Sequence, residues 1–505
     1  MADKNAEVAV EGNGGMKKTL SLWNFFTIGF GAIIGTGWVL QVGDWMVVGG
    51  GPVPAMIAFL LGAIFLVPVG AVFGELTAAI PISGGIVEYV DRSFGRTLSY
   101  ITGWLLALGN GILCPWEAIA ISTLVSEMFG SLPGLEWLRA VKLYTILGAD
   151  VYLFPTLIAL GFATYVIFLN FRGASSAAKL QAFLTKALLC GMLLAMGVSL
   201  FTGSPDNAMP VFSQVTGAGG GKPATEGTSL FAGIVSVLVL TPFFYAGFDT
   251  IPQQAEEAAE GLNWNKFGKI ISLALLAAGG FYMVCIYSFG TILDWHEFVK
   301  SPVPALACLK DINMLLYLAM LVIATLGPMG PMNSFYGAHE PHHARHGRKA
   351  SCPRSRRGRS QVRRSQARLR RSGVITVVGP FLGKNMLIPL TNVSALAFIF
   401  SCGMVALACL RMRFTEPDLP RPYEVPGGKF GISLAIVACG TIIGLLVIPF
   451  SPASLNMVEW SIVIGWLAVG LASWPSPIPA KITPSRGGSG ARNPLSRAPN
   501  PAALG

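Results

Sequence analysis

Long apolar runs are the feature of this 505-residue chain that most restricts its fold. A helix needs about 20 apolar residues to cross the ~30 Å hydrocarbon core of a bilayer. Runs of that length lie near residues 20–46, 53–80, 98–129, 152–171, 177–202, 229–255, 267–293, 314–338, 386–411, 430–450 and 456–474. Only 12% of the residues are charged, about half the share of a soluble domain, so a soluble enzyme, a disordered chain and a fibrous repeat are all excluded. The sequence predicts an all-α polytopic membrane protein.

A shorter apolar stump at Gly373–Gly383 indicates one further span. As a helix it would rise only about 16 Å, half the width of the core, so we interpret it as a truncated ninth span in a twelve-span design. If the N-terminus is cytoplasmic, the inner segments hold 29 Lys and Arg residues and the outer loops hold 6, as the positive-inside rule requires. We therefore expect a multi-pass protein of the plasma or inner membrane with both termini in the cytoplasm.

A basic island at residues 336–373 interrupts this design. Between His339 and Arg371 there are twelve Lys and Arg residues and one acidic residue, whereas the rest of the chain has no net charge. A nucleic-acid or anionic-lipid patch and a histidine metal site are alternatives. The abrupt change in composition favours two compensating reading-frame shifts, which translation of the resequenced gene in all three frames would test. We predict no nucleic-acid partner, metal or cofactor.

Glycine-rich interruptions occur in the first and sixth spans, at Gly35-Thr36-Gly37 and at 242–249. Non-helical backbone inside a membrane is tolerated where it lines a cavity, and matched interruptions in two halves of a chain point to a transport site. Helix packing through Gly31 and Gly35 is the alternative. At such a break, free N–H groups suit a carboxylate and free carbonyls suit an ammonium group. The pair of breaks predicts a site for a zwitterion.

Three ionisable residues lie within the predicted spans. Glu117 is in the middle of the third span, Lys186 is deep in the fifth, and Asp249 is beside the sixth-span interruption. Because such residues are costly in a membrane, each is a functional candidate. The two acids are candidates for binding a substrate amine or coupling a proton, and Lys186 for replacing a coupling cation. Alternatively, the carboxyls are hydrogen-bonded within the bundle and Lys186 faces a wet cavity.

Four motifs together resemble the amino acid–polyamine–organocation (APC) permease superfamily. They are GAIIGTG at 31–37, the GEL segment at 74–76 with its following Ile-Pro and Gly-Gly pairs, FFYAGFDTIPQQAEE at 243–257, and RPYEVP at 421–426. They occur in order at the ends or centres of the expected spans. The resemblance covers residues 17–335 and 374–474, and it is to the amino acid permease branch.

This resemblance implies a LeuT-like fold of two five-helix inverted repeats followed by two extra C-terminal helices. The implied division is a cytoplasmic leader at 1–19, a first repeat at 20–202, a second repeat at 229–411 interrupted at about 336–373, two further spans at 430–474 and a disordered cytoplasmic tail at 475–505. The Arg-rich island would truncate span 9. It would also remove the end of span 8, which belongs with span 9 to the scaffold of the family fold.

The resemblance also implies a substrate site. Gly35, Thr36 and Gly37 match the carboxylate-binding turn, and Ile33 and Ile34 match the carbonyls that meet the amino group. The full set of expected substrate-binding residues is Ile33, Ile34, Gly35, Thr36, Gly37, Glu117, Phe243, Tyr245, Gly247 and Asp249, with Glu117, Lys186 and Asp249 as coupling candidates. Lys186 departs from the family pattern, because it lies two residues before the lysine of proton-coupled relatives.

The expected function is secondary-active amino acid transport by alternating access, coupled to protons or to a counter-substrate. The expected partners are an amino acid or amine substrate and the lipid bilayer. A polyamine or ethanolamine carrier and a nonfunctional frameshifted permease are alternatives. A membrane-embedded enzyme is disfavoured and no catalytic residues are predicted. GxSxG does not occur in the chain, and the one HExxH match, HEPHH at 339–343, lies in a Gly-, Pro- and Arg-rich run where no helix is expected to fix metal ligands.

Overall fold

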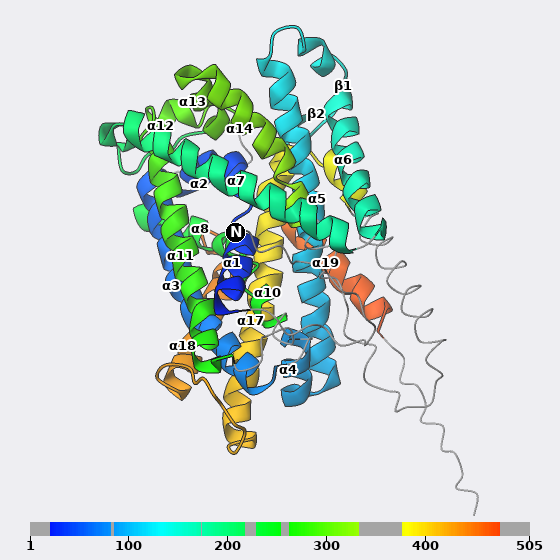
Figure 1. Cartoon of the computed structure of the whole chain (residues 1–505), viewed down its shortest axis with the longest axis vertical. Helices are drawn as coiled ribbons and strands as arrows, with labels where there is room; N and C mark the ends of the chain where they lie inside the picture. The colour runs from blue at the N-terminus through cyan, green and yellow to red at the C-terminus, as the bar shows by residue number, and fades with distance from the viewer. Residues whose placement is uncertain are drawn as a thin grey trace, which may run out of the picture.

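The computed structural model describes residues 21–81, 85–172, 174–217, 229–253, 262–332 and 376–474. The predicted leader, the basic island and the predicted tail all lie outside these described residues. Within them the chain forms a helical bundle, with one two-stranded hairpin at one end (Figure 1).

The first half of the described chain contains α1 (Leu22–Ile33), α2 (Gly37–Gly49), α3 (Pro52–Ala79), α4 (Gly85–Phe94), α5 (Arg96–Ser131), the antiparallel strands β1 (Lys142–Ile146) and β2 (Ala149–Tyr152), α6 (Leu153–Arg172) and α7 (Ala174–Thr202). The second half contains α8 (Leu230–Leu238), α9 (Thr241–Tyr245), α10 (Thr250–Gln253), α11 (Trp264–Gly290), α12 (Trp295–Phe298), α13 (Pro304–Ile312), α14 (Met314–Leu326), α17 (Leu387–Thr415), α18 (Lys429–Val447) and α19 (Met457–Ala472).

The predicted membrane character is confirmed in its coarse form. In the described part of the chain, six helices are long and apolar enough to cross a membrane, and eight if each of two bent helix pairs is one span. The two bent pairs are α1 with α2 and α8 with the helical segment that follows it. In the described part of the apolar stump, residues 376–378 are α-helical and a short 3-10 helix follows at Gly379–Phe381.

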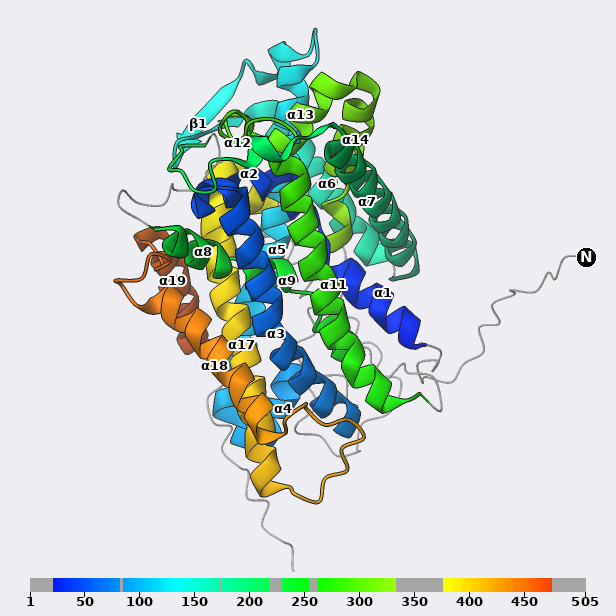
Figure 2. The same cartoon turned by 90° about the vertical axis from the view of Figure 1, so that its left-hand side faces the viewer.

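Helices α3 and α11 lie side by side through the middle of the bundle (Figure 2). Glycines allow this close approach: a Cβ atom on Gly74 of α3 would lie only 2.7 Å from the carbonyl oxygen of Gly268 in α11. Small residues at such contacts allow two helix backbones to approach each other closely, as is common between membrane helices. The α3–α11 pair is thus a tightly packed support for the two broken helices beside it.

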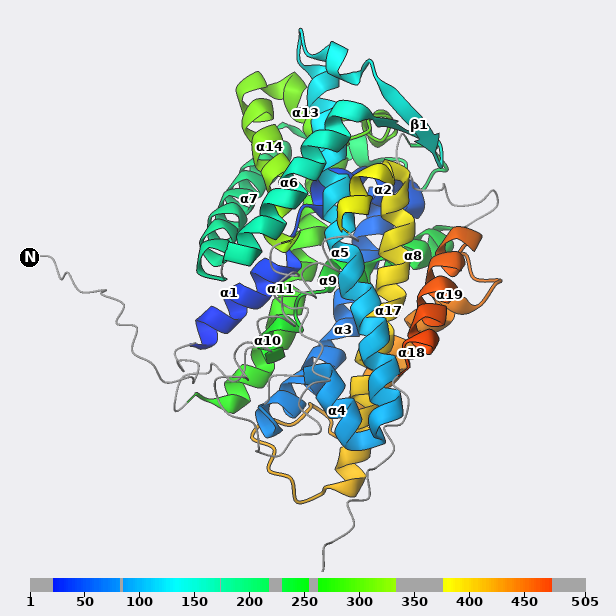
Figure 3. The same cartoon turned by 90° about the vertical axis from the view of Figure 1, so that its right-hand side faces the viewer.

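The hairpin lies at the same end of the bundle as α12 and α13, whereas α4 and the loop between α17 and α18 lie at the opposite end (Figures 2 and 3). The Tyr144 hydroxyl of β1 donates a hydrogen bond to the carbonyl of Phe381 at 2.5 Å, and the Asn385 amide donates to the carbonyl of Leu147 at 2.7 Å. These bonds hold the hairpin over the start of α17. We refer to the two ends as the hairpin end and the α4 end.

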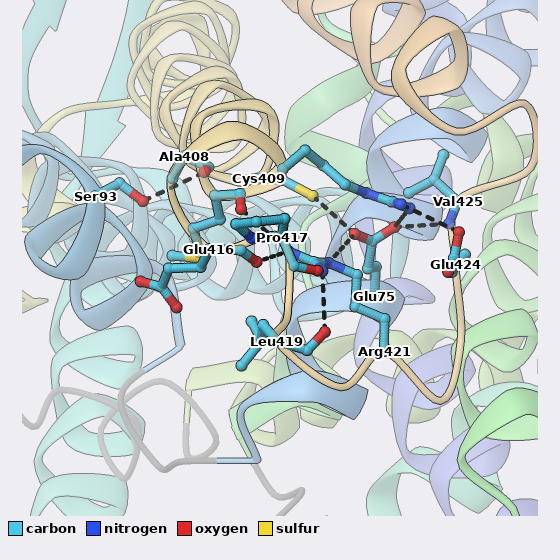
Figure 4. A network of polar contacts seen from close by, with 12 residues as sticks. Glu75, Ser93, Ala408, Cys409, Glu416, Pro417, Leu419, Arg421, Glu424 and Val425 are labelled. Carbon is cyan, nitrogen blue, oxygen red and sulfur yellow. Dashed lines mark hydrogen bonds and ion pairs between the residues drawn. The ribbon is translucent and has the colours of Figure 1, made fainter.

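A buried ion cluster ties α3 to α17 at the α4 end (Figure 4). The Glu75 carboxylate is 1% exposed; it accepts a hydrogen bond from Arg413 of α17 at 2.7 Å and one from the backbone N–H of Val425 at 2.8 Å. The Nε atom of Arg421 lies 3.3 Å from the same carboxylate. Arg421 also donates to four carbonyl groups, those of Met412, Glu416, Pro417 and Leu419. One acid therefore organises the whole loop that follows α17.

Candidate functional site

The first helix break separates α1 from α2, whose axes are bent by 53°. Thr36 occupies the N-cap position of α2, but its side chain makes no cap hydrogen bond to that helix. The Thr36 hydroxyl donates instead to Oε2 of Glu117 in α5, at 2.8 Å. The first N–H groups of α2 therefore lack a side-chain cap from Thr36, although the N–H of Val39 donates to the Thr36 carbonyl at 3.1 Å. Such groups, together with the positive end of the helix dipole, favour an anionic ligand group.

The second helix break follows α9. Helix α9 ends at Tyr245, and Gly247 then adopts a φ of +122°, a conformation that side-chain-bearing residues rarely take. The N–H of Gly247 donates to Oδ1 of Asp249 at 3.1 Å, and the Thr250 hydroxyl donates to the carbonyl of Gly247 at 2.6 Å. These local bonds satisfy backbone groups that have left the helix, which is what a membrane interior requires.

The two breaks are in direct contact with each other. A Cβ atom on Gly247 would lie 2.7 Å from the carbonyl carbon and oxygen of Ala32 at the end of α1. The Tyr282 hydroxyl of α11 lies 3.2 Å from the carbonyl oxygen of Ile33 and 3.3 Å from that of Phe244, and its one proton can be donated to either. Tyr282 therefore bridges the two broken helices from the supporting helix behind them.

A small cavity of about 30 Å³ lies at the breaks. It is lined by Ala32, Ile33, Gly35, Thr36, Gly37, Leu113, Trp116, Glu117, Phe243, Phe244, Ala246, Tyr282 and Pro331. The volume is close to that of one water molecule, so a larger ligand must displace side chains. Glu117 supplies the carboxyl group of this lining and is 4% exposed. Glu117 lies two residues after Pro115, which is inside α5. Because proline has no backbone N–H, one hydrogen bond of the helix interior is missing there.

The structure brings together six of the predicted substrate-binding residues around this cavity: Ile33, Gly35, Thr36, Gly37, Glu117 and Phe243. The other four, Ile34, Tyr245, Gly247 and Asp249, lie beside the breaks without lining the cavity. The Tyr245 hydroxyl donates to the carbonyl of Phe59 in α3 at 2.7 Å and so faces away from the cavity. Lys186 is exposed on α7 and is not part of the lining.

Several lining residues were not anticipated from the sequence. Leu113 and Trp116 come from α5, Tyr282 from α11 and Pro331 from the helical turns that extend α14. Trp116 directly precedes the predicted Glu117, and Tyr282 is a hydroxyl-bearing residue within an apolar run. Each of these positions is a weak indication in the sequence that the residue belongs to a site. Leu113 and Pro331 carried none, because only the packing of the helices decides which face of an apolar span meets the cavity.

The described lining of the cavity carries three oxygen-bearing side chains, those of Thr36, Glu117 and Tyr282. Across the described residues, His, Cys, Asp and Glu form no group of three that could hold a metal. The histidine-rich stretch at 339–346 lies outside the described residues.

Comparison with known proteins identifies the family of this chain. Residues 20–472 match the sequence model of a family described as amino acid permease. A branched-chain amino acid permease of Bacillus subtilis is 24% identical over 448 residues, which cover 85% of this chain and 88% of the relative. An aspartate-proton symporter of the same organism is 34% identical over 122 residues, 24% of this chain and 22% of the relative. A vacuolar cationic amino acid transporter of Arabidopsis thaliana is 27% identical over 311 residues, 61% of this chain and 46% of the relative.

The names of these relatives mention neutral, acidic and cationic amino acids, so the comparison by itself selects no substrate. They share a class of protein: all are membrane transporters, and none is an enzyme. The family match extends over most of the chain, through both helix breaks and the loop at the α4 end. The chain therefore belongs to the amino acid permease family of the APC superfamily.

Proposed function

We propose that this chain is a secondary-active amino acid transporter that works by alternating access, with its substrate bound at the two helix breaks. The observation that carries the proposal is the direct contact of these breaks around one cavity, whose described lining includes the Glu117 carboxyl group. Discontinuous helices at the centre of a membrane bundle are the form that substrate sites take in many secondary transporters.

The main-chain groups of an amino acid suit the first break. The substrate carboxylate would meet the N–H groups at the start of α2, near Gly37. The ammonium group would meet carbonyl oxygens at the end of α1, near Ile33, where the negative end of that helix dipole lies. Gly35 has no side chain between these groups, so the ligand can approach the backbone closely.

We further propose the twelve-span, five-plus-five repeat arrangement, with the α4 end in the cytoplasm and the hairpin end outside. The charge distribution of the loops supports this orientation. In this orientation the Glu75 cluster, which joins α3 to α17 and to the loop after it, would lie at the cytoplasmic end. Because the cavity has room for about one water molecule, transport requires Phe243 and its neighbours to move as substrate enters.

The three coupling candidates differ in position. Glu117 lines the cavity and accepts the hydroxyl of Thr36. The Asp249 carboxylate accepts the N–H of Gly247 outside the cavity, and Lys186 is exposed on α7. A proton on Glu117 would change both the charge of the cavity and the bond to the start of α2. We therefore propose Glu117 as the coupling group.

Glu117→Gln is expected to remove the pH dependence of uptake, because glutamine keeps a hydrogen-bond acceptor for Thr36 but cannot exchange a proton. The measurement is the initial rate of uptake of a labelled amino acid into proteoliposomes, across roughly pH 5 to 8. Asp249→Asn and Lys186→Ala are the comparison variants, and both should keep the wild-type pH profile. An unchanged profile in Glu117→Gln would assign coupling to another group.

A further inference from the structure

Two tryptophans hold α19 against α5, the helix that carries Glu117. The rings of Trp104 in α5 and Trp466 in α19 are stacked, with centroids 4.7 Å apart and planes inclined at 22°. The indole N–H of Trp104 donates to the backbone carbonyl of Trp466 at 3.0 Å, and the indole N–H of Trp466 donates to the carbonyl of Trp104 at 2.9 Å. We call this reciprocal pair the tryptophan clasp. Hydrogen bonds between helices hold them together where both surfaces are apolar.

The next turn of α19 extends the clasp. A Cβ atom on Gly470 would lie 2.7 Å from Cδ1 of the Trp104 ring, so the glycine is what lets the ring approach α19 this closely. The carbonyl of Gly470 also accepts the hydroxyl of Tyr100, one turn before Trp104 in α5, at 3.1 Å. The Tyr100 ring contacts that of Trp474 edge to face, with centroids 4.8 Å apart. The contact therefore extends over more than one turn of each helix.

The opposite end of α19 is fixed to α17. Glu459 is 1% exposed, and its carboxylate accepts the side-chain amide of Asn392 in α17 at 2.7 Å and the N–H of Asn456 at the start of its own helix at 2.6 Å. Asn392 is next to Thr391, whose hydroxyl oxygen accepts the indole N–H of Trp116 at 3.1 Å. Trp116 in turn lines the cavity. The residue of α17 that Glu459 binds is thus the neighbour of the residue that holds a wall of the cavity.

These contacts make α19 a brace between α5 and α17. Its first turn is bonded near the start of α17, towards the hairpin end, and its last turns are bonded near the start of α5, towards the α4 end. Helices α5 and α17 are also bonded directly, because the Ser394 hydroxyl donates to the carbonyl of Gly109 at 2.9 Å. The cavity residues Trp116 and Glu117 follow on the same helix, Trp116 about 18 Å beyond Trp104 along its axis. Holding both helices therefore fixes the α5 side of the cavity.

The hydrogen bonds around the cavity divide its walls into two groups of helices. The two helix breaks are held from α3 and α11, through the bond of Tyr245 to Phe59 and the contacts of Tyr282. The opposite wall is held by α5, α17 and α19. The two groups meet at the cavity, where Thr36 donates to Glu117. Alternating access requires one rigid group to move against another around the site, and this division indicates which helices move together.

We propose that α19 joins α5 and α17 into one rigid body, and that Trp466 and Glu459 are positioning residues that keep Trp116 and Glu117 in place while the broken helices move. This inference rests on the proposed transport function. It gives the last described helix, which follows the two predicted repeats, a role in substrate affinity, although neither positioning residue lines the cavity.

The positioning role of Trp466 is tested by uptake kinetics on the full chain in proteoliposomes, with the labelled protein amino acid that the wild type takes up fastest. Trp466→Phe keeps a ring for stacking and removes the N–H donor, and Trp466→Ala removes both. We expect KM to rise about fivefold in Trp466→Phe, the equivalent of one net hydrogen bond, and further in Trp466→Ala, while the maximal rate per chain in the membrane is unchanged. Leu471→Ala is the matched control, because this side chain of α19 is 73% exposed.

Wild-type KM in both tryptophan variants would overturn the assignment. A lower maximal rate with an unchanged KM would also overturn it, because that result is the sign of a merely structural role. Glu459→Gln keeps an acceptor for Asn392 and should keep KM near the wild-type value, whereas Glu459→Ala should raise it. Absence of uptake of every protein amino acid by the wild type would overturn the proposed function, and this inference with it.

The rigid-body claim is tested by cross-linking in a Cys190→Ser, Cys352→Ser chain. Among the described cysteines Cys190 is exposed and the other six are buried, and Cys352 lies outside the described residues. Trp104→Cys with Gly470→Cys joins α5 to α19 and replaces the clasp by a covalent link. A short bifunctional methanethiosulfonate reagent closes the pair, and a reducing agent opens it. We expect KM to be raised about fivefold in the open form and to return to the value of the background chain in the closed form.

A second pair of cysteines is the contrast. Ser236→Cys with Pro452→Cys joins α8 to the loop before α19, at a place where the Ser236 hydroxyl donates to the Pro452 carbonyl at 3.4 Å. Because α8 belongs to the second bent pair and α19 to the proposed rigid body, closing this link should stop uptake, and opening it should restore uptake. Loss of uptake on closing the first pair would show that α5 and α19 move against each other and would overturn the inference. Continued uptake with the second pair closed would overturn the division into two groups, and the inference with it.

Discussion

Gly247→Ala is expected to abolish uptake. The φ of +122° is strained for any residue with a Cβ atom, and the added atom would lie 2.7 Å from the backbone of Ala32 and 2.9 Å from the backbone nitrogen of Ile33. Backbone strain and overpacking together cost roughly 2–6 kcal/mol. Because the opposing atoms are backbone atoms, a rotamer change cannot relieve the clash, and α1 must shift away from α9.

The measurement is the initial rate of amino acid uptake, normalised to the amount of chain in the membrane, and we expect a loss of more than about 30-fold. Gly280→Ala is the matched control, because a Cβ atom there meets nothing within 4 Å. Gly37→Ala gives an intermediate case: its Cβ atom would lie 2.6 Å from the ring of Phe244, a side chain that can move. Wild-type uptake by Gly247→Ala would show that the contact between the breaks is not needed for transport.

Glu75→Ala is expected to cause the largest loss of stability. The carboxylate is 1% exposed and meets Arg413, Arg421 and the N–H of Val425, so its removal leaves a buried N–H without its acceptor and two arginines without their buried counter-charge. Breaking a buried ion pair in this way costs about 3–5 kcal/mol. Glu75→Gln, which retains an acceptor for Val425 but loses the charge, should fall between the alanine variant and the wild type.

The measurement is the free energy of unfolding of the purified chain in detergent. Glu424→Ala is the control, because Glu424 pairs with the same arginine at 3.1 Å but is 60% exposed. An exposed pair is worth about 0–1 kcal/mol, so this variant should be close to the wild type. Equal and small effects of the two substitutions would mean that the cluster does not hold α3 to α17.

The sequence predicted the features that depend on local chemistry. The glycines of Gly35-Thr36-Gly37 interrupt an apolar run, and the structure has its first helix break there. Gly247 likewise follows the end of α9. Such breaks can be predicted from a sequence because glycine weakens a helix within a few residues of its own position. The hairpin at Lys142–Tyr152 left no comparable signal, because its turn places Leu147 at a φ of +49°, where Asn, Asp or Gly is the usual residue.

The features that depend on packing could not be predicted. The pairing of Glu75 with Arg413 joins residues separated by 338 positions, and several other acids and bases in the sequence were equally plausible partners. The contact of Trp116 with Thr391 joins two uniformly apolar helices, in which periodicity does not show the buried face. In a membrane protein both the lipid-facing and the buried surfaces are apolar, so hydropathy gives the position of a span but not its rotation.

The central claim, that substrate binds at the two helix breaks, is tested most directly by binding of a labelled neutral amino acid to Gly35→Ala. A Cβ atom at this position would lie 3.8 Å from Pro331 and 3.9 Å from the Glu117 carboxylate. These are ordinary contact distances, so the methyl group fills the cavity without disturbing the fold. Gly440→Ala, on α18 and with nothing within 4 Å of its Cβ atom, is the control. The account predicts wild-type thermal stability for both variants and at least about tenfold weaker binding for Gly35→Ala alone. Wild-type affinity in Gly35→Ala would contradict it.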